Sequence, residues 1–148
     1  MNTMKRKITL IVIHCSATRC NRAYTVQQLY HDHVEVNHWR FIGYHFYIRR
    51  DGKVEATRPL ERIGAHAKGH NAHSIGICYE GGLDEQGHYA DTRTEAQKQA
   101  MRKLVVQLKQ QFPTIVNLVG HRDLPGVQKA CPCFDASELL PLIRRSQS

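Results

Sequence analysis

The sequence predicts a mixed α/β (α+β) fold, in which a central mixed β-sheet is flanked by helices. Residues 8–13 form a continuous apolar run rich in β-branched side chains, which is typical of a strand covered on both faces. Residues 94–112 carry apolar side chains at helical spacing, which predicts a long amphipathic helix. Between them, Asp51-Gly52 separates two strand-like segments and indicates a β-hairpin. This alternation of strands and helices favours a mixed sheet with helices packed on it.

The first strand is followed by a loop and then by a helix. Residues 16–24 are polar and loop-like. Thr25 and Gln28 have the spacing of a capping box, so we expect a helix to begin there. It should end near Asn37-His38, because these residue types tolerate a left-handed cap better than most.

The middle of the chain predicts the hairpin, a loop and a second buried strand. Apolar and polar side chains alternate over residues 44–49, and the chain then turns into a second strand at 53–57. Residues 64–74 are small, polar and rich in histidine, and indicate a loop. Residues 74–82 then read as a buried strand that ends on a pair of glycines.

The last part of the chain predicts a helix, a strand and a closing helix. The helix at 94–112 begins on a second capping box and stops before Pro113. Residues 117–120 form a short apolar strand. Residues 135–144 favour a short helix that is interrupted or ended around Pro141.

Length and composition bound the class of protein. A chain of 148 residues with 41% hydrophobic and 23% charged residues is consistent with one globular domain spanning 1–148, with a core of about residues 8–143. The formal net charge of +8 favours an anionic partner, which could be a nucleic acid, a cell-wall polymer or an acidic membrane. The positive residues are scattered and match no nucleic-acid-binding motif, so we expect no specific nucleic-acid partner.

The cysteines and the N-terminal run bear on the compartment. Five cysteines at irregular spacing make a poor disulfide framework and favour synthesis in a reducing compartment. The apolar run at 8–13 is shorter than the hydrophobic part of a signal peptide, and no run is long enough to span a bilayer. We therefore expect synthesis in the cytoplasm without a signal peptide and no membrane insertion.

Two predicted strands lead directly into histidines, His14 and His121. Functional groups gather at strand ends in open sheets that are packed with helices. Cys131 stands ten residues beyond His121. Two imidazoles and a thiolate are good zinc ligands, and three protein ligands leave a fourth position for water. We expect Cys15 not to join them, because adjacent strand residues point to opposite faces.

Other residues compete for the same metal. The candidates are His66, His70 and His73 in the histidine-rich loop and the pair Cys131 and Cys133. We favour a substrate-facing loop with His66 as its main contributor, and a simple buried role for Cys133. His31 and His33 are two residues apart on a predicted helix, so they point to different sides and lie at its surface and edge.

Four segments in series carry a resemblance to a known family. They read IVIHCSAT, IGYHFYIRRDGKV, GAHAKGHNAHSIGICYEGG and GHRDLPGVQKACPCFD, and they cover nearly all of the chain. Together they closely resemble the type 2 N-acetylmuramoyl-L-alanine amidases, the group that includes the bacteriophage T7 lysozyme and the peptidoglycan recognition proteins. One departure is Asn37-His38-Trp39, where relatives commonly have glycine before the tryptophan, and it concerns only a helix cap.

The resemblance implies an activity and a set of site residues. It implies that Zn²⁺ is held by His14, His121 and Cys131 in a groove at the strand ends, and that Tyr44 and Lys129 take part in catalysis. It also implies that His66 and Asn71 line the peptidoglycan groove. The implied reaction is hydrolysis of the amide between N-acetylmuramic acid and the L-alanine of the stem peptide.

Alternative functions remain open at this point. The chain could be a peptidoglycan-recognition module that binds stem peptides without cutting them, although members of that branch lose the zinc cysteine, which is present here. A basic nucleic-acid-binding protein is the less favoured alternative. A lone amidase domain resembles a phage or prophage endolysin, which we expect to be a monomer that reaches the cell wall after release or by another export route.

Overall fold

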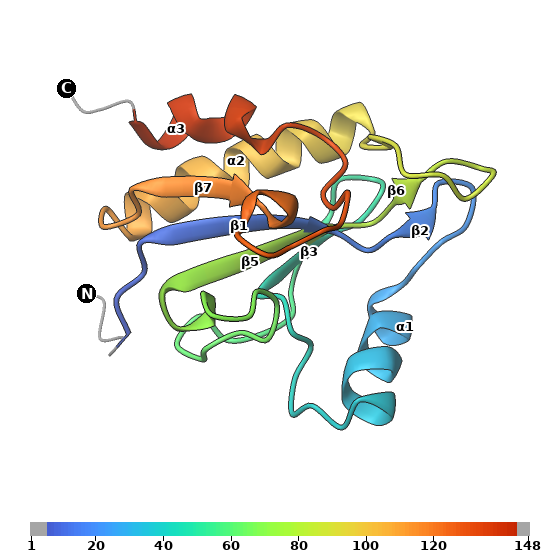
Figure 1. Cartoon of the computed structure of the whole chain (residues 1–148), viewed down its shortest axis with the longest axis horizontal. Helices are drawn as coiled ribbons and strands as arrows, with labels where there is room; N and C mark the ends of the chain where they lie inside the picture. The colour runs from blue at the N-terminus through green and yellow to red at the C-terminus, as the bar shows by residue number, and fades with distance from the viewer. Residues whose placement is uncertain (1–5, 145–148) are drawn as a thin grey trace.

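A computed structural model describes residues 6–144 of the chain, and its centre is a five-stranded sheet (Figure 1). The strand order is β4-β3-β5-β1-β7. The strands are β1 (Leu10–Cys15), β3 (Phe46–Ile48), β4 (Val54–Ala56), β5 (Ser74–Tyr79) and β7 (Asn117–Gly120). Only β4 runs antiparallel to its neighbour, so the expected mixed sheet is confirmed. Two short strands, β2 (Thr18–Arg19) and β6 (Gly82–Leu83), form a separate parallel pair.

Helices lie on the sheet and beyond its edge. The longest, α2 (Glu95–Gln111), packs with α3 (Leu140–Arg144) over one face of the sheet, whereas α1 (Val26–Tyr30) lies away from that layer (Figure 1). A π-helical segment, η1 (His31–Val36), continues α1. Short 3₁₀ turns occur at η2 (Asn71–His73), η3 (His121–Asp123) and η4 (Ala136–Leu139). No helix within residues 6–144 has the length and apolar character needed to cross a membrane.

The central strand β1 is buried on both faces, as its apolar run predicted. Ile11 and Ile13 belong to the main core, which includes Met101 and Val105 of α2. Val12 faces the other way and packs in a smaller cluster with Ala67. Because side chains alternate along a strand, His14 lies on the same face as Val12, while Cys15 belongs to the core beneath α2. The expectation that Cys15 points away from His14 is therefore confirmed.

Two predicted strand boundaries are wrong by about two residues. β1 begins at Leu10 and continues to Cys15, because its ladder with β5 extends to the pair Cys15 and Tyr79. His14 therefore lies within the strand and not after it. The hairpin strand β3 begins at Phe46, so Tyr44 lies in the loop that precedes it. The Asp51-Gly52 turn is confirmed, with Gly52 in the left-handed region at φ +91°.

The first helix is correctly placed, but its geometry changes along its length. The capping box of Thr25 and Gln28 is present, as is the second box that begins α2. After Tyr30 the helix widens, and the N–H of Asn37 donates to the carbonyl of Asp32, five residues back. His38 follows with a left-handed φ of +62°, as expected for the cap. Pro141 lies in the first turn of α3 and does not interrupt it, since a proline is tolerated there.

Candidate active site

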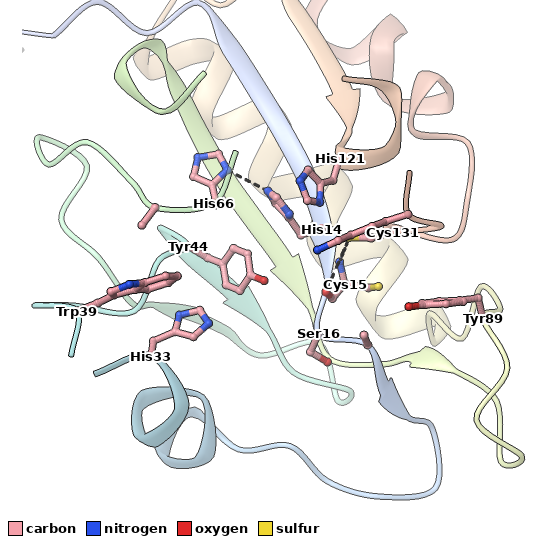
Figure 2. A pocket seen from close by; sticks show the side chains of 13 residues that line it. His14, Cys15, Ser16, His33, Trp39, Tyr44, His66, Tyr89, His121 and Cys131 are labelled. Atoms are coloured by element: carbon pink, nitrogen blue, oxygen red, sulfur yellow. Dashed lines mark hydrogen bonds between the residues drawn. The ribbon is translucent and has the colours of Figure 1, made fainter. Parts of the chain in front are cut away.

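His14 and His121 meet because their strands are parallel neighbours. Ile13 of β1 pairs with Gly120 of β7, so the next residue of each chain segment emerges at the same edge of the sheet. The two imidazole rings lie side by side, with centroids 4.6 Å apart (Figure 2). The structure thus brings together two candidate ligands that are more than a hundred residues apart in the sequence.

Cys131 completes this cluster from the loop that follows η3. Its sulfur accepts a hydrogen bond from the backbone N–H of Cys15 (3.1 Å), and its carbonyl accepts one from the N–H of Arg122 (2.8 Å). One ligand atom each from His14, His121 and Cys131 lies within 4.8 Å of the others. Within residues 6–144 these three form the one group of histidine, cysteine and acidic side chains that is close enough to hold a metal ion.

The chemistry of this donor set fits zinc. Zinc favours nitrogen and sulfur ligands in tetrahedral geometry, and three protein ligands are typical of catalytic sites. Burial lowers the pKa of His14 well below its ordinary value, and burial together with nearby Lys129 lowers the pKa of His121. Both imidazoles are therefore neutral near pH 7, which is the form that binds a metal.

Tyr44 and Lys129 both line the hollow above this cluster. The ring of Tyr44 lies 5.0 Å from that of His14, centroid to centroid, and points into the hollow (Figure 2). Burial raises the pKa of Tyr44 well above its ordinary value, so the phenol keeps its proton. Lys129 is exposed, stands two residues before Cys131 and also lines the hollow. Both residues therefore border the same hollow as the histidine and cysteine cluster, and the catalytic roles that the resemblance implies for them stay predictions.

The two predicted groove residues of the histidine-rich loop differ in position. His66 lines the hollow, and its Nδ1 lies 2.9 Å from Nε2 of His14. Asn71 is not among the lining residues. Its side-chain oxygen accepts the backbone N–H groups of His66 (3.0 Å) and Ala67 (2.9 Å), and so holds the loop in place. A side chain used in this way supports the site from behind.

Three further residues form the walls of the hollow, which has a volume of about 370 Å³. His33 and Trp39 lie on one side and Tyr89 on the other (Figure 2). The expectation that His33 lies at the surface and edge of its helix misses this role: the ring packs at a tilt against Trp39 (4.7 Å between centroids), and its Nδ1 accepts the N–H of Gly43 (3.0 Å). The wide turn of η1 ahead of Trp39 has no signature in the sequence. Trp39 and Tyr89 are large aromatic side chains that the structure leaves exposed at this hollow.

The competing metal candidates lie elsewhere. His70 and His73 pack edge to face, with ring centroids 5.6 Å apart, and line a different hollow beside Leu10. Cys133 is partly buried, and its sulfur lies 3.9 Å from that of Cys15, on the core side of the strand. His31 is exposed and pairs with Glu35. None of these side chains belongs to the cluster of His14, His121 and Cys131.

Comparisons with known proteins identify the family of the chain. Residues 4–134 match the model of the family described as N-acetylmuramoyl-L-alanine amidase. The chain is 43% identical to an endolysin of Klebsiella phage KP32 over 133 residues, covering 90% of this chain and 85% of the relative. It is 42% identical to the endolysin of Escherichia phage T7 over 125 residues, covering 84% and 80%.

Solved structures give the same result for the fold. The endolysin N-acetylmuramoyl-L-alanine amidase LysCS from Clostridium intestinale aligns with a TM-score of 0.75 and 31% identity over 92% of this chain and 82% of that one. The peptidoglycan-recognition protein PGRP-SA of Apis mellifera, at 21% identity and a TM-score of 0.72, shares the fold over 93% and 88% of the two chains. Because the family model matches residues 4–134, which are most of the chain, this chain belongs to the N-acetylmuramoyl-L-alanine amidase family.

Proposed function

We propose that this protein is a zinc-dependent N-acetylmuramoyl-L-alanine amidase that hydrolyses the amide between N-acetylmuramic acid and the L-alanine of the peptidoglycan stem peptide. The observation that carries the proposal is the cluster of His14, His121 and Cys131 at the base of a hollow that also holds Tyr44 and Lys129. The similarity to phage endolysins supports a lytic enzyme of the same kind that acts on the cell wall.

The reaction needs help at two points, since an amide carbonyl is a poor electrophile and neutral water is a poor nucleophile. Zinc bound by the three side chains would supply Lewis acidity for both needs. The protein contributes the neutral imidazoles of His14, which lies in β1, and of His121, which directly follows the neighbouring strand β7, together with a sulfur oriented by the Cys15 N–H. This rigid support keeps the three ligands at one edge of the sheet.

The two remaining side chains act on the substrate itself. The ammonium group of Lys129, at the rim of the hollow, can stabilise negative charge that develops on the carbonyl oxygen. The protonated phenol of Tyr44 can orient the attacking water or pass a proton to the leaving amine. Trp39 and Tyr89 face each other across the hollow and offer apolar walls for the muramyl peptide.

Digestion of purified peptidoglycan, followed by mass spectrometry of the products, tests the proposal. We expect soluble stem peptides with a free N-terminal alanine, and no such release after the zinc is removed with a chelator. Release of reducing sugar ends would identify a glycosidase and overturn the proposal. Binding to peptidoglycan without release of either product would identify a non-catalytic binding module.

A further inference from the structure

His66 makes a contact that a substrate-binding residue would not need. Its Nδ1 lies 2.9 Å from Nε2 of His14, and its Nε2 lies 3.2 Å from the hydroxyl oxygen of Ser74 (Figure 2 shows the first contact). Both ring nitrogens of His66 are therefore engaged within the protein. Although the ring borders the hollow, it has no nitrogen left for a ligand.

We propose that His66 is a positioning residue that fixes the proton of His14 on Nε2 and so leaves Nδ1 of His14 as the metal-binding atom. The inference rests on the zinc site of the proposed function. Nε2 of His14 already faces His66, so only Nδ1 can turn its lone pair toward His121 and Cys131. A neutral imidazole that ligates through Nδ1 carries its proton on Nε2.

Placing the proton of His14 on Nε2 fixes the direction of both hydrogen bonds that run from His14 through His66 to Ser74. Nε2–H of His14 donates to Nδ1 of His66, so the proton of neutral His66 lies on its own Nε2. This second N–H donates to the hydroxyl oxygen of Ser74, which is fully buried at the start of β5. Metal-binding histidines commonly donate their second N–H to a partner that orients the ring and increases its basicity as a ligand.

The surrounding backbone is shaped to hold the His66 ring in this position. A Cβ on Gly76 would lie 2.6 Å from Cγ of His66, and one on Gly64 would lie 2.6 Å from its Cδ2. Only glycine leaves space for the ring at these two sites. The side-chain oxygen of Asn71 fixes the backbone of His66 by accepting a hydrogen bond from its N–H. The ring is thus clamped between β5 and its own loop, as expected of a fixed support.

Zinc affinity, measured without substrate by competition with a chromogenic chelator, tests the proposal on the full chain. His66→Leu removes the acceptor, and we expect zinc binding to weaken by about ten- to a hundredfold. His66→Asn places a carbonyl oxygen where Nδ1 was, so it should restore affinity to within a few-fold of the parent. His73→Asn, in the same loop but outside the cluster, is the matched control and should leave affinity unchanged.

A measurement on the unsubstituted protein does not depend on whether a variant folds. In metal-free protein at neutral pH, ¹⁵N-detected NMR of the histidine rings should show His14 protonated on Nε2 and His66 unprotonated on Nδ1. A proton on Nδ1 of His14 would overturn the proposal. So would zinc affinity within twofold of the parent in His66→Leu, or equal losses in His66→Leu and His66→Asn, which would indicate loss of packing. Because these readouts need no substrate, they are independent of whether the protein cleaves peptidoglycan.

Discussion

Replacing Cys131 with serine should remove most of the zinc affinity. The sulfur of Cys131 is one of three ligand atoms within 4.8 Å of one another, and the residue is 8% exposed. Structural zinc sites with four ligands bind with about 10–16 kcal/mol, so each ligand contributes roughly 3 kcal/mol. Since about 1.4 kcal/mol corresponds to tenfold in affinity, the expected loss for Cys131→Ser is on the order of a hundredfold.

Cys133→Ser is the matched control for this experiment. Cys133 lies two residues away, and its thiol donates to the carbonyl of Gly82 (3.4 Å), a contact that a hydroxyl can also make. Zinc affinity and amidase activity should therefore stay close to those of the parent. Both would be measured by chelator competition and by release of alanine-terminated peptides. Full metal binding and activity in Cys131→Ser, with loss of both in Cys133→Ser, would show that the wrong cysteine has been assigned to the metal.

Three further predictions concern Tyr44, Lys129 and His45. Tyr44→Phe keeps the ring but loses the hydroxyl, so kcat should fall by about 10²- to 10⁴-fold with unchanged zinc affinity; an unchanged kcat would exclude a role in proton transfer. Lys129→Met should lower kcat by about 10²- to 10³-fold without loss of zinc, and an effect confined to KM would assign Lys129 to binding alone. Burial lowers the pKa of His45 to about 4, so only the unfolded chain binds this proton between about pH 6.5 and 4. As the pH falls through that range, His45 should lower the free energy of unfolding by about 1.4 kcal/mol per pH unit. Denaturant titrations at several pH values, on metal-free protein, should show that the free energy of unfolding depends less steeply on pH in His45→Asn than in the parent.

The buried strands and the amphipathic helix were predictable because their patterns are local. The apolar run of β1 and the stripe of α2 each record contact with a core, and capping boxes mark the starts of α1 and α2. The two-residue error at the end of β1 has a tertiary cause. Pairing with β5 extends the strand through His14 and Cys15. The residue types of these two positions do not show this, because the end of the strand depends on how far β5 continues beside it.

The site was predictable where its residues follow strands, and less so where loops decide. His14 and His121 could be paired from their positions at two strand ends. Cys131 was favoured over Cys133 already from the residues, since Pro132 and Phe134 beside Cys133 favour a simple buried role for it, and the resemblance to a family implies the same choice. The position of His33 depends on the wide turn of η1, and the bracing role of Asn71 depends on hydrogen bonds to backbone groups four and five residues away; neither follows from a recognisable residue pattern. That Asn71 also lines the groove stays a prediction.

The parallel pairing of β1 and β7 separates the parts of the site that can change from those that cannot. The two proposed metal ligands stand directly after this ladder, which ends at the pair Ile13 and Gly120, so the register of the strands fixes where the backbones of His14 and His121 lie. The aromatic side chains that form the walls, Trp39 and Tyr89, lie on loops outside β1 and β7. Variants with altered sequences in these two loops should therefore change which peptidoglycan types the enzyme prefers, while the proposed metal cluster keeps its geometry.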